Sequence, residues 1–227
     1  FLPQVNQSRR KNVLQPKADK IVGLMKKIDQ KFSKIVDVGA GDGSLLEILR
    51  KKEFGESYLA IEPSEFGIES CKSKNLDYYL GFLSDVVRKE TFNNFADLVM
   101  CFEVFEHIWS TKNFLRDLKS ITKPGGYILL TTLSVSGFDL KVLGQHSKSI
   151  CPPAHLNFIS REGVAPLLAS VGLNQIFYFT PGVLDVDIVR NVYLEDKNLV
   201  RDPLIAELMA IGDDKLFAGL QDFITKS

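Results

Sequence analysis

The sequence predicts a doubly wound α/β fold, in which a mostly parallel sheet is covered by helices. Short apolar segments alternate with helical patterns between residues 34 and 190, an alternation typical of βαβ units. The first apolar segment, Ile35–Val38, runs into three glycines at alternate positions, and a helical pattern follows them. Such a glycine turn is typical of nucleotide-binding sites at the carboxyl edge of a parallel sheet.

The individual elements follow from the same patterns. We expect strands at 34–38, 57–61, 77–80, 97–101, 126–132, 174–179 and 184–190. We expect helices at 17–31, 44–52, 64–73, 111–121 and about 160–170, and one or two more within 202–224. Pro181-Gly182 would form the turn between the last two strands. The connection 133–154 is long for a compact domain, which is typical of a functional or mobile segment.

The 227 residues, 45% of them hydrophobic, are enough for one large α/β domain with a full core. We expect an N-terminal helical cap (1–33), a core (34–190) and a C-terminal helical extension (191–227). No apolar run reaches the roughly 18 residues of a membrane helix. The chain begins with Phe rather than Met. Its first residues lack the apolar core of a signal peptide, and a further module could precede them.

Charge and cysteine usage narrow the function classes. The formal net charge is zero, which argues against a nucleic-acid partner. The cysteines Cys71, Cys101 and Cys151 are isolated, which argues against a zinc ribbon or a disulfide framework. A reducing compartment, the cytoplasm, fits best.

The N-terminal segment 1–34 is strongly basic, with nine Lys and Arg residues against two Asp. Its apolar residues from Ala18 to Phe32 recur at helical spacing, so that one face is apolar and the other cationic. Two interpretations are open. Either the helix packs on the core with a solvated lysine face, or some of these charges meet an anionic substrate.

The spacing of the glycines distinguishes two kinds of ligand. A dinucleotide fingerprint places its third glycine at position 44, but position 44 is Ser and the third glycine is Gly43. The strand also ends in Asp37, and a carboxylate there suits a cationic group better than a pyrophosphate. The pattern Asp-x-Gly-x-Gly-x-Gly resembles motif I of the class I S-adenosylmethionine-dependent methyltransferases. That resemblance implies cofactor contacts at Asp37, Gly39, Ala40 and Gly41, with the carboxylate near the methionine amino group.

A second acidic residue, Glu62, ends the next predicted strand about twenty residues after the glycines. A carboxylate at this position can accept two hydrogen bonds from a ribose diol. The alternative interpretation is a solvated acid at the end of a strand. Spacing relative to the glycine turn favours the ribose contact.

Three further stretches extend the resemblance. The strand and Glu-His of Ala96–His107, the helix after them and Lys123-Pro-Gly-Gly are similar to the small-molecule branch that includes quinone-biosynthesis O-methyltransferases. Cys151–Gly163 resembles the Pro-Pro-x-His-x-Asn-Phe segment of this branch, which lies close to the substrate. Thr180–Val189 resembles its last hairpin and strand. The resemblance implies a Rossmann-like sheet of seven strands with an antiparallel last strand. It also implies cofactor contacts at Leu83 and Phe102, for which core packing is the alternative.

The candidate general bases are histidines, because their unperturbed pKa lies near neutrality. His107 follows the fourth predicted strand, and His155 lies in the segment that resembles the substrate-side element. A structural role is the alternative for each. His146 lies in the long connection, and its spacing to Cys151 and His155 matches no standard ligand set, so no metal site is expected.

These observations lead to a prediction of function. We expect methyl transfer from S-adenosyl-L-methionine to a small molecule, leaving S-adenosyl-L-homocysteine. Fold-level analogy adds a sugar or polysaccharide precursor as the acceptor, without nucleic acid or a membrane span. The alternatives are a catalytically inactive S-adenosylmethionine-binding module and, disfavoured by the glycine spacing, an NAD-dependent dehydrogenase.

Overall fold

The computed structural model describes residues 9–28, 30–174, 177–179 and 185–226. The chain divides into two compact units, residues 1–131 and 132–227. Each unit has its own elements and is described by itself. The predicted division at 33/34 and 190/191 stays a prediction.

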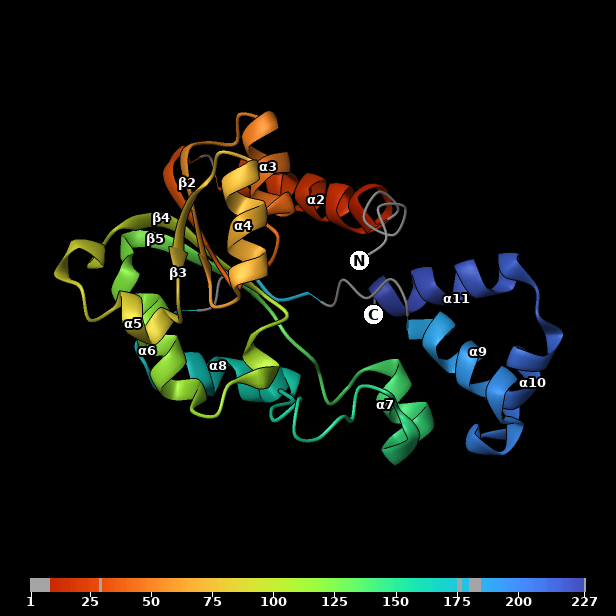
Figure 1. The fold of residues 1–227 in the computed structure, drawn as a ribbon. Helices are drawn as coiled ribbons and strands as arrows, with labels where there is room; N and C mark the ends of the chain where they lie inside the picture. Colours follow the sequence, from red (N-terminus) through yellow and green to blue (C-terminus); the bar gives the residue numbers. More distant parts are fainter. Residues whose placement is uncertain (1–8, 29, 175–176, 180–184, 227) are drawn as a thin grey trace. The chain divides into compact units, whose positions relative to one another are not determined.

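The first unit is built on a five-stranded sheet in which every pairing is parallel (Figure 1). The order of the strands is β3-β2-β1-β4-β5. Their bounds are β1 Phe32–Val38, β2 Gly55–Glu62, β3 Asp77–Leu80, β4 Ala96–Phe102 and β5 Thr122–Thr131.

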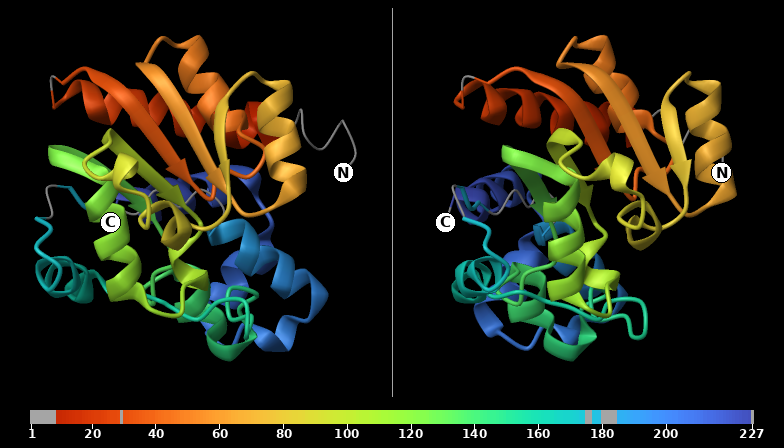
Figure 2. Two further views of the ribbon diagram at one scale, coloured as in Figure 1. Left: turned by 60° about the vertical axis from the view of Figure 1, so that its left-hand side comes forward. Right: turned by 90° about the vertical axis from the view of Figure 1, so that its left-hand side faces the viewer.

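Helices cover both faces of this sheet (Figure 2). One face carries α2, α3 and α4, whose apolar residues share a core with alternate residues of the strands. The opposite face carries α5 and α6, and α6 packs on β4 and β5. The helical bounds are η1 Arg10–Leu14, α2 Gln15–Lys26, α3 Ser44–Lys51, α4 Glu65–Ser73, α5 Leu83–Val86, η2 Glu90–Phe92, η3 Phe105–His107 and α6 Thr111–Ile121.

The strand order creates a switch point between β1 and β4. The chain proceeds outward from β1 through β2 to β3, and then returns to place β4 on the other side of β1. Val38 pairs with Cys101 at the ends of these two strands. Connections leave this point in opposite directions, and the crevice at such a carboxyl edge is where doubly wound folds bind ligands.

The second unit is helical in its described residues. Its elements are α7 Phe138–Leu143, η4 Gly144–His146, α8 Arg161–Ala169, α9 Asp185–Glu195, η5 Lys197–Leu199, α10 Pro203–Ile211 and α11 Asp214–Lys226. Residues of α7, α9, α10 and α11 form its core. Ser160 caps α8 as predicted, since its Oγ accepts from the Gly163 N–H at 3.0 Å.

The prediction of the first five strands is confirmed, whereas that of a seventh is wrong. Residues 185–190 begin helix α9, no strand is present at 174 or 177–179, and Pro181-Gly182 lies outside the described residues. Within the described chain the sheet is therefore five-stranded and wholly parallel, without an antiparallel last strand. The alternating Leu-Asp-Val-Asp-Ile pattern suggested a strand, but the buried residues Val186, Val189, Val192 and Tyr193 follow helical spacing.

Among the described residues, no helix combines the length and the hydropathy needed to cross a membrane.

Candidate cofactor and acceptor sites

The glycine turn has the backbone that its sequence predicted. Gly39, Gly41 and Gly43 have φ angles of 75°, 55° and 69°, all in the left-handed region that glycine tolerates best. The N–H of Gly39 donates to the Ile61 carbonyl at 2.8 Å, which ties the turn to the end of β2. Asp42 closes the start of α3, because its carboxylate accepts from both the N–H (3.1 Å) and the Oγ (2.7 Å) of Ser44.

The three glycines are needed for different reasons. A Cβ at Gly39 would collide with Val104, and one at Gly43 would lie 2.7 Å from the Cys71 Sγ. These two positions are therefore fixed by packing. A Cβ at Gly41 would meet nothing within 4 Å. Gly41 is the point at which the turn presents bare backbone to open space, as contact with a ligand requires.

Glu62 is not a solvated acid at the end of a strand. Its side chain is buried, Oε2 accepts from the Gly41 N–H at 2.8 Å, and Oε1 accepts from the Ser64 N–H at 3.0 Å. A carboxylate has about four acceptor positions, so each oxygen can accept one further hydrogen bond. The residue thus holds the glycine turn in place and keeps capacity for a diol.

Sequence reasoning missed Gly67, which allows α4 to approach the turn. A Cβ at Gly67 would lie 2.6 Å from the Gly41 carbonyl oxygen and 2.8 Å from Glu62 Cγ. The glycine at the third position of α4 is the signal that could have identified it, because glycine inside a helix is unfavourable unless packing requires it.

Asp37 is buried at the end of β1. Burial raises the pKa of its carboxyl to about 7, the Lys17 ammonium opposes that rise, and the Glu62 carboxylate adds to it. A carboxyl with this pKa is close to its midpoint at neutral pH. A cationic ligand group beside it would favour the ionised form.

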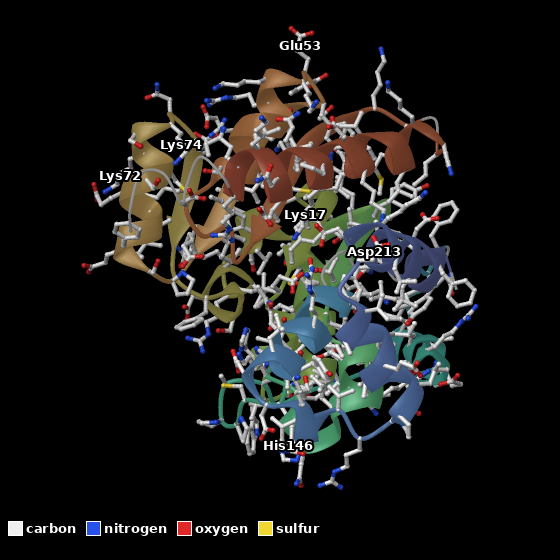
Figure 3. All side chains as sticks on the ribbon, turned by 90° about the vertical axis from the view of Figure 1, so that its right-hand side faces the viewer. Lys17, Glu53, Lys72, Lys74, His146 and Asp213 are labelled. Atoms are coloured by element: carbon white, nitrogen blue, oxygen red, sulfur yellow. The ribbon has the colours of Figure 1, made fainter. Side chains whose placement is uncertain are left out.

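Lys17 was not singled out by the sequence, and the structure brings it to the strand ends from α2 (labelled in Figure 3). Its Nζ lies 4.9 Å from the centroid of the Phe102 ring and 3.9 Å from Glu103 Oε1. Glu103 has a φ of 55°, and it accepts from Thr131 Oγ1 at 2.8 Å. A non-glycine residue in this region is strained, and such strain is concentrated at functional sites.

The remaining residues predicted to contact the cofactor also lie at the carboxyl edge of the sheet, and they differ in their exposure to solvent. Ala40 and Phe102 are half-buried, and each packs against the core of the first unit. Leu83 starts α5 and is buried, so its side chain serves packing. Leu80 and Phe82, after β3, are instead exposed apolar side chains that the sequence analysis did not select.

Comparisons with known proteins identify the family of this chain. A family model described as a methyltransferase domain matches residues 7–176 of the 227. This chain belongs to the methyltransferase family. The predicted family is thereby confirmed, since the matched domain is that of the class I S-adenosylmethionine-dependent methyltransferases.

Curated relatives of this methyltransferase include two ubiquinone biosynthesis O-methyltransferases. The mitochondrial protein of Homo sapiens is 31% identical over 156 residues, 62% of this chain and 41% of that protein. The protein of Rhodopseudomonas palustris is 29% identical over 119 residues, 49% of this chain and 44% of that protein. The chain thus spans less than half the length of these two relatives.

Solved structures show the same fold. A methyltransferase from Archaeoglobus fulgidus has a TM-score of 0.56 and 15% identity, over 88% of this chain and 94% of that one. A methyltransferase from Thermotoga maritima has a TM-score of 0.56 and 16% identity, over 75% and 78%.

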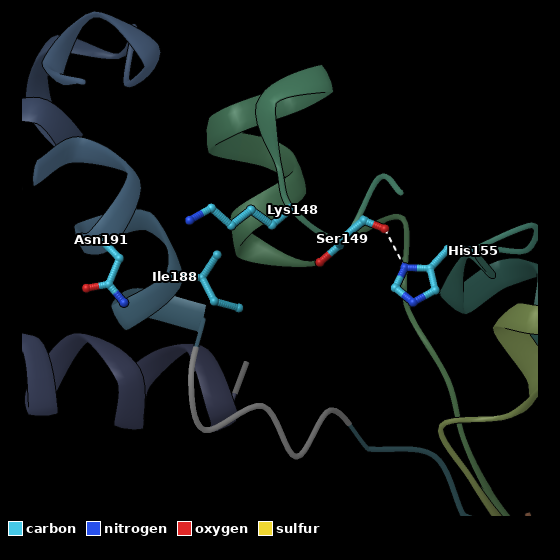
Figure 4. A pocket seen from close by; sticks show the side chains of 5 residues that line it. All are labelled: Lys148, Ser149, His155, Ile188 and Asn191. Atoms are coloured by element: carbon cyan, nitrogen blue, oxygen red, sulfur yellow. Dashed lines mark hydrogen bonds between the residues drawn. The ribbon is translucent and has the colours of Figure 1, made fainter. Parts of the chain in front are cut away.

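The three histidines of the methyltransferase have different settings. His107 is exposed and ends η3 in the first unit, directly after the buried Glu106. His155 lies in the second unit on a pocket of about 270 Å³ that is also lined by Lys148, Ser149, Ile188 and Asn191 (Figure 4). His146 ends η4 and does not line that pocket. The predicted absence of a metal site stays untested.

Proposed function

We propose that this chain transfers the methyl group of S-adenosylmethionine to an oxygen atom of a small molecule. The observation that carries the proposal is the arrangement at the ends of β1 and β2. There, open backbone at Gly41, a buried carboxylate at Glu62 and a second buried carboxylate at Asp37 lie on one edge of the sheet.

Each part of the donor has a counterpart on this edge. The remaining acceptor positions of Glu62 suit the ribose diol, and Asp37 suits the methionine ammonium. The exposed apolar side chains Leu80 and Phe82 suit the adenine ring. Gly41 lets the cofactor lie against the main chain.

The reaction needs little covalent chemistry from the protein. The sulfonium methyl is already activated, so the enzyme aligns donor and acceptor and excludes water. As the acceptor oxygen attacks the methyl carbon, the carbon–sulfur bond breaks and the acceptor proton needs a base. We assign that role to His155, which lines a pocket, with His107 as the alternative.

The relatives favour an oxygen atom as the acceptor. Their printed names are those of O-methyltransferases of ubiquinone biosynthesis, which supports an active enzyme over a catalytically inactive binding module. The sugar or polysaccharide acceptor drew on the segment 152–158 together with the segment 180–187. Residues 180–184 of the second segment lie outside the described chain and its remainder is helical, so this acceptor ranks second.

The proposal also concerns the charge of the methyl acceptor and the cellular compartment of the protein. Lys17 and Lys148 each face a carboxylate, so an anionic acceptor has little support beyond the basic N-terminal segment. The free cysteines suit a reducing compartment such as the cytoplasm.

Calorimetry with S-adenosylhomocysteine and NAD tests the donor site. We expect binding of S-adenosylhomocysteine and none of NAD, because the third glycine lies at position 43. Tight NAD binding without a thermal shift from S-adenosylhomocysteine would overturn the proposal. An assay with methyl-labelled donor then compares catechol with simple sugars as acceptors.

A further inference from the structure

Two successive carbonyl groups of the glycine turn are bound by side chains of α4 and its C-cap. The Asp42 carbonyl oxygen accepts from Lys74 Nζ at 2.8 Å, and the Gly41 carbonyl oxygen accepts from Cys71 Sγ at 3.8 Å. Burial raises the pKa of the Cys71 thiol to about 11, so the sulfur carries its proton at neutral pH and can donate. Both carbonyls are thereby turned toward α4.

The ammonium of Lys74 makes three hydrogen bonds, and all three acceptors are uncharged oxygens. Besides the Asp42 carbonyl, it donates to Ser70 Oγ at 2.6 Å and to the Ser70 carbonyl at 3.5 Å. A lysine at the end of a helix often binds the last carbonyls of that helix, and the contacts with Ser70 are of this kind. The contact with Asp42 differs, because it joins the end of α4 to the turn that precedes α3.

Arg50, in the last turn of α3, makes the reciprocal contact. Its two terminal nitrogens donate to the carbonyls of Lys74 at 2.6 Å and of Asn75 at 2.7 Å. Hydrogen bonds from a charged donor are stronger than neutral ones. The main chain of Lys74 is therefore held by α3, while its side chain holds the turn from which α3 begins.

The Lys74 contact fixes the peptide group that closes the turn. In the peptide between Asp42 and Gly43, the N–H donates to the Ala40 carbonyl at 3.0 Å and the C=O accepts from Lys74. The N–H and C=O of a planar trans peptide point in opposite directions, so the two bonds support a single orientation. Gly41 lies inside this closed turn, and a Cβ on it would meet nothing within 4 Å.

We propose that Lys74 is a positioning residue for the methyl donor: by holding the Asp42 carbonyl toward α4, it keeps the glycine turn in the conformation against which S-adenosylmethionine lies. This inference rests on the proposed function for the identity of the donor. It assigns to Lys74 no contact with the reacting atoms, since the side chain acts through the main chain of the turn.

Calorimetry with S-adenosylhomocysteine tests the effect on binding. Lys74→Met removes the ammonium and keeps most of the aliphatic stem, so affinity should fall about tenfold through the loss of a charge-assisted hydrogen bond. Lys74→Arg keeps a cation that can donate to the same oxygens, and affinity should recover to within about threefold of the unaltered protein.

Lys72→Met is the matched control. Lys72 lies two residues before Lys74 at the end of the same helix, is exposed, and has its Nζ 2.6 Å from Glu69 Oε1 (both lysines are labelled in Figure 3). This variant removes the same charge without removing a bond to the turn, and it should leave the affinity unchanged. An equal loss in both variants would mean that the charge itself, not the bond to Asp42, supports binding.

Amide hydrogen exchange followed by NMR gives a readout that a merely structural role would not produce. The Gly43 N–H closes the turn, whereas the Gly39 N–H donates to the Ile61 carbonyl at 2.8 Å and so reports on the end of β2. In Lys74→Met, protection of Gly43 should fall about tenfold and that of Gly39 should stay within about twofold. A general loss of stability would lower both together, which would contradict the inference.

Ser70→Ala gives a second test should Lys74→Met fail to fold. It removes one acceptor of the ammonium and leaves Lys74 in place, so the affinity and the protection of Gly43 should each fall about two- to threefold. The inference is overturned if the folded Lys74→Met protein keeps its affinity and its Gly43 protection, or if Lys74→Met does not fold and Ser70→Ala changes neither. Failure of the proposed function would be seen separately, because the unaltered protein would then not bind S-adenosylhomocysteine.

Discussion

The two ends of the sheet in the first unit each carry a largely buried aspartate, and the two aspartates have opposite electrostatics. At the amino end, Asp97 accepts from the N–H groups of Ser33 (3.0 Å) and Lys34 (2.7 Å) and from Lys123 Nζ (2.7 Å). Burial acts to raise the pKa of Asp97, but the Lys123 ammonium and the two N–H donors outweigh it and lower that pKa. This carboxylate joins the starts of β1, β4 and β5.

At the carboxyl end, burial outweighs the neighbouring charge. The pKa of Asp37 is raised to about 7, against the influence of Lys17. The same edge holds the left-handed glycines and the left-handed Glu103. At the amino end, hydrogen bonds and an ion pair within the protein thus stabilise the ionised form of Asp97. At the carboxyl end, an added cation would be needed to stabilise the ionised form of Asp37.

The two shifts have opposite consequences for stability. The contribution of Asp97 is present above its unfolded pKa and is lost as pH falls through its lowered folded pKa. The contribution of Asp37 is complete below its unfolded pKa near 3.8 and is lost as pH rises to about 7. At neutral pH Asp97 therefore stabilises the fold, whereas Asp37 is close to half ionised and its ionised form has no sufficient stabilising partner.

The largest expected effect is that of Gly41→Val. The side chain would occupy the open space at the turn, so binding of S-adenosylhomocysteine should fall more than about 100-fold by calorimetry, equal to about 3 kcal/mol. Gly125→Val is the matched control, because Gly125 also has a positive φ of 77° and nothing within 4 Å, but lies in β5 near the amino end. It should lose similar stability and retain binding. Equal binding losses in both variants would mean that strain, not contact, explains the effect.

Glu62→Gln comes next. Both oxygens of Glu62 accept from backbone N–H groups, so either orientation of the amide turns its NH₂ toward a donor. Together with the loss of charge, this should weaken S-adenosylhomocysteine binding by roughly 10- to 100-fold. Asp97→Asn, at the opposite end, should lower the melting temperature and leave that affinity unchanged. Normal binding by the Gln variant would show that the ribose is held elsewhere.

A feature could be predicted from the sequence where neighbouring residues determine it. It could not be predicted where it arises only from contacts between distant segments. The five strands, the glycine turn and Glu62 have local signals: apolar runs, left-handed glycines, and an acid at a strand end. Lys17 has none, because it reaches Phe102 only through packing of a helix that precedes the sheet. Helix α9 was mistaken for a strand because its β-branched residues also alternate with aspartates.

The third prediction concerns pH. If the ammonium of the donor requires ionised Asp37, binding releases a proton, and affinity rises with pH through about 7. A carboxyl with that pKa changes its ionised fraction about tenfold between pH 8 and pH 6, so affinity for S-adenosylhomocysteine should fall about tenfold over this range. Asp37→Asn should bind more weakly and lose this dependence. A pH-independent affinity in the unaltered protein would show that Asp37 does not contact the ammonium of the ligand.

The smallest expected effect is that of Lys17→Met. This variant tests whether the Lys17 ammonium opposes the effect of burial on the pKa of Asp37. Lys17 lowers the pKa of Asp37 against the effect of burial, so its removal should raise that pKa and move the midpoint of the binding–pH curve upward. Affinity for S-adenosylhomocysteine at pH 7.5 should fall roughly threefold and recover at higher pH, since a shift of less than one pKa unit changes the ionised fraction by less than tenfold. Lys26→Met, on the exposed end of the same helix, should leave the curve in place. A loss of affinity in Lys17→Met that is equal at every pH would instead mean that the ammonium contacts the ligand directly and does not act through Asp37.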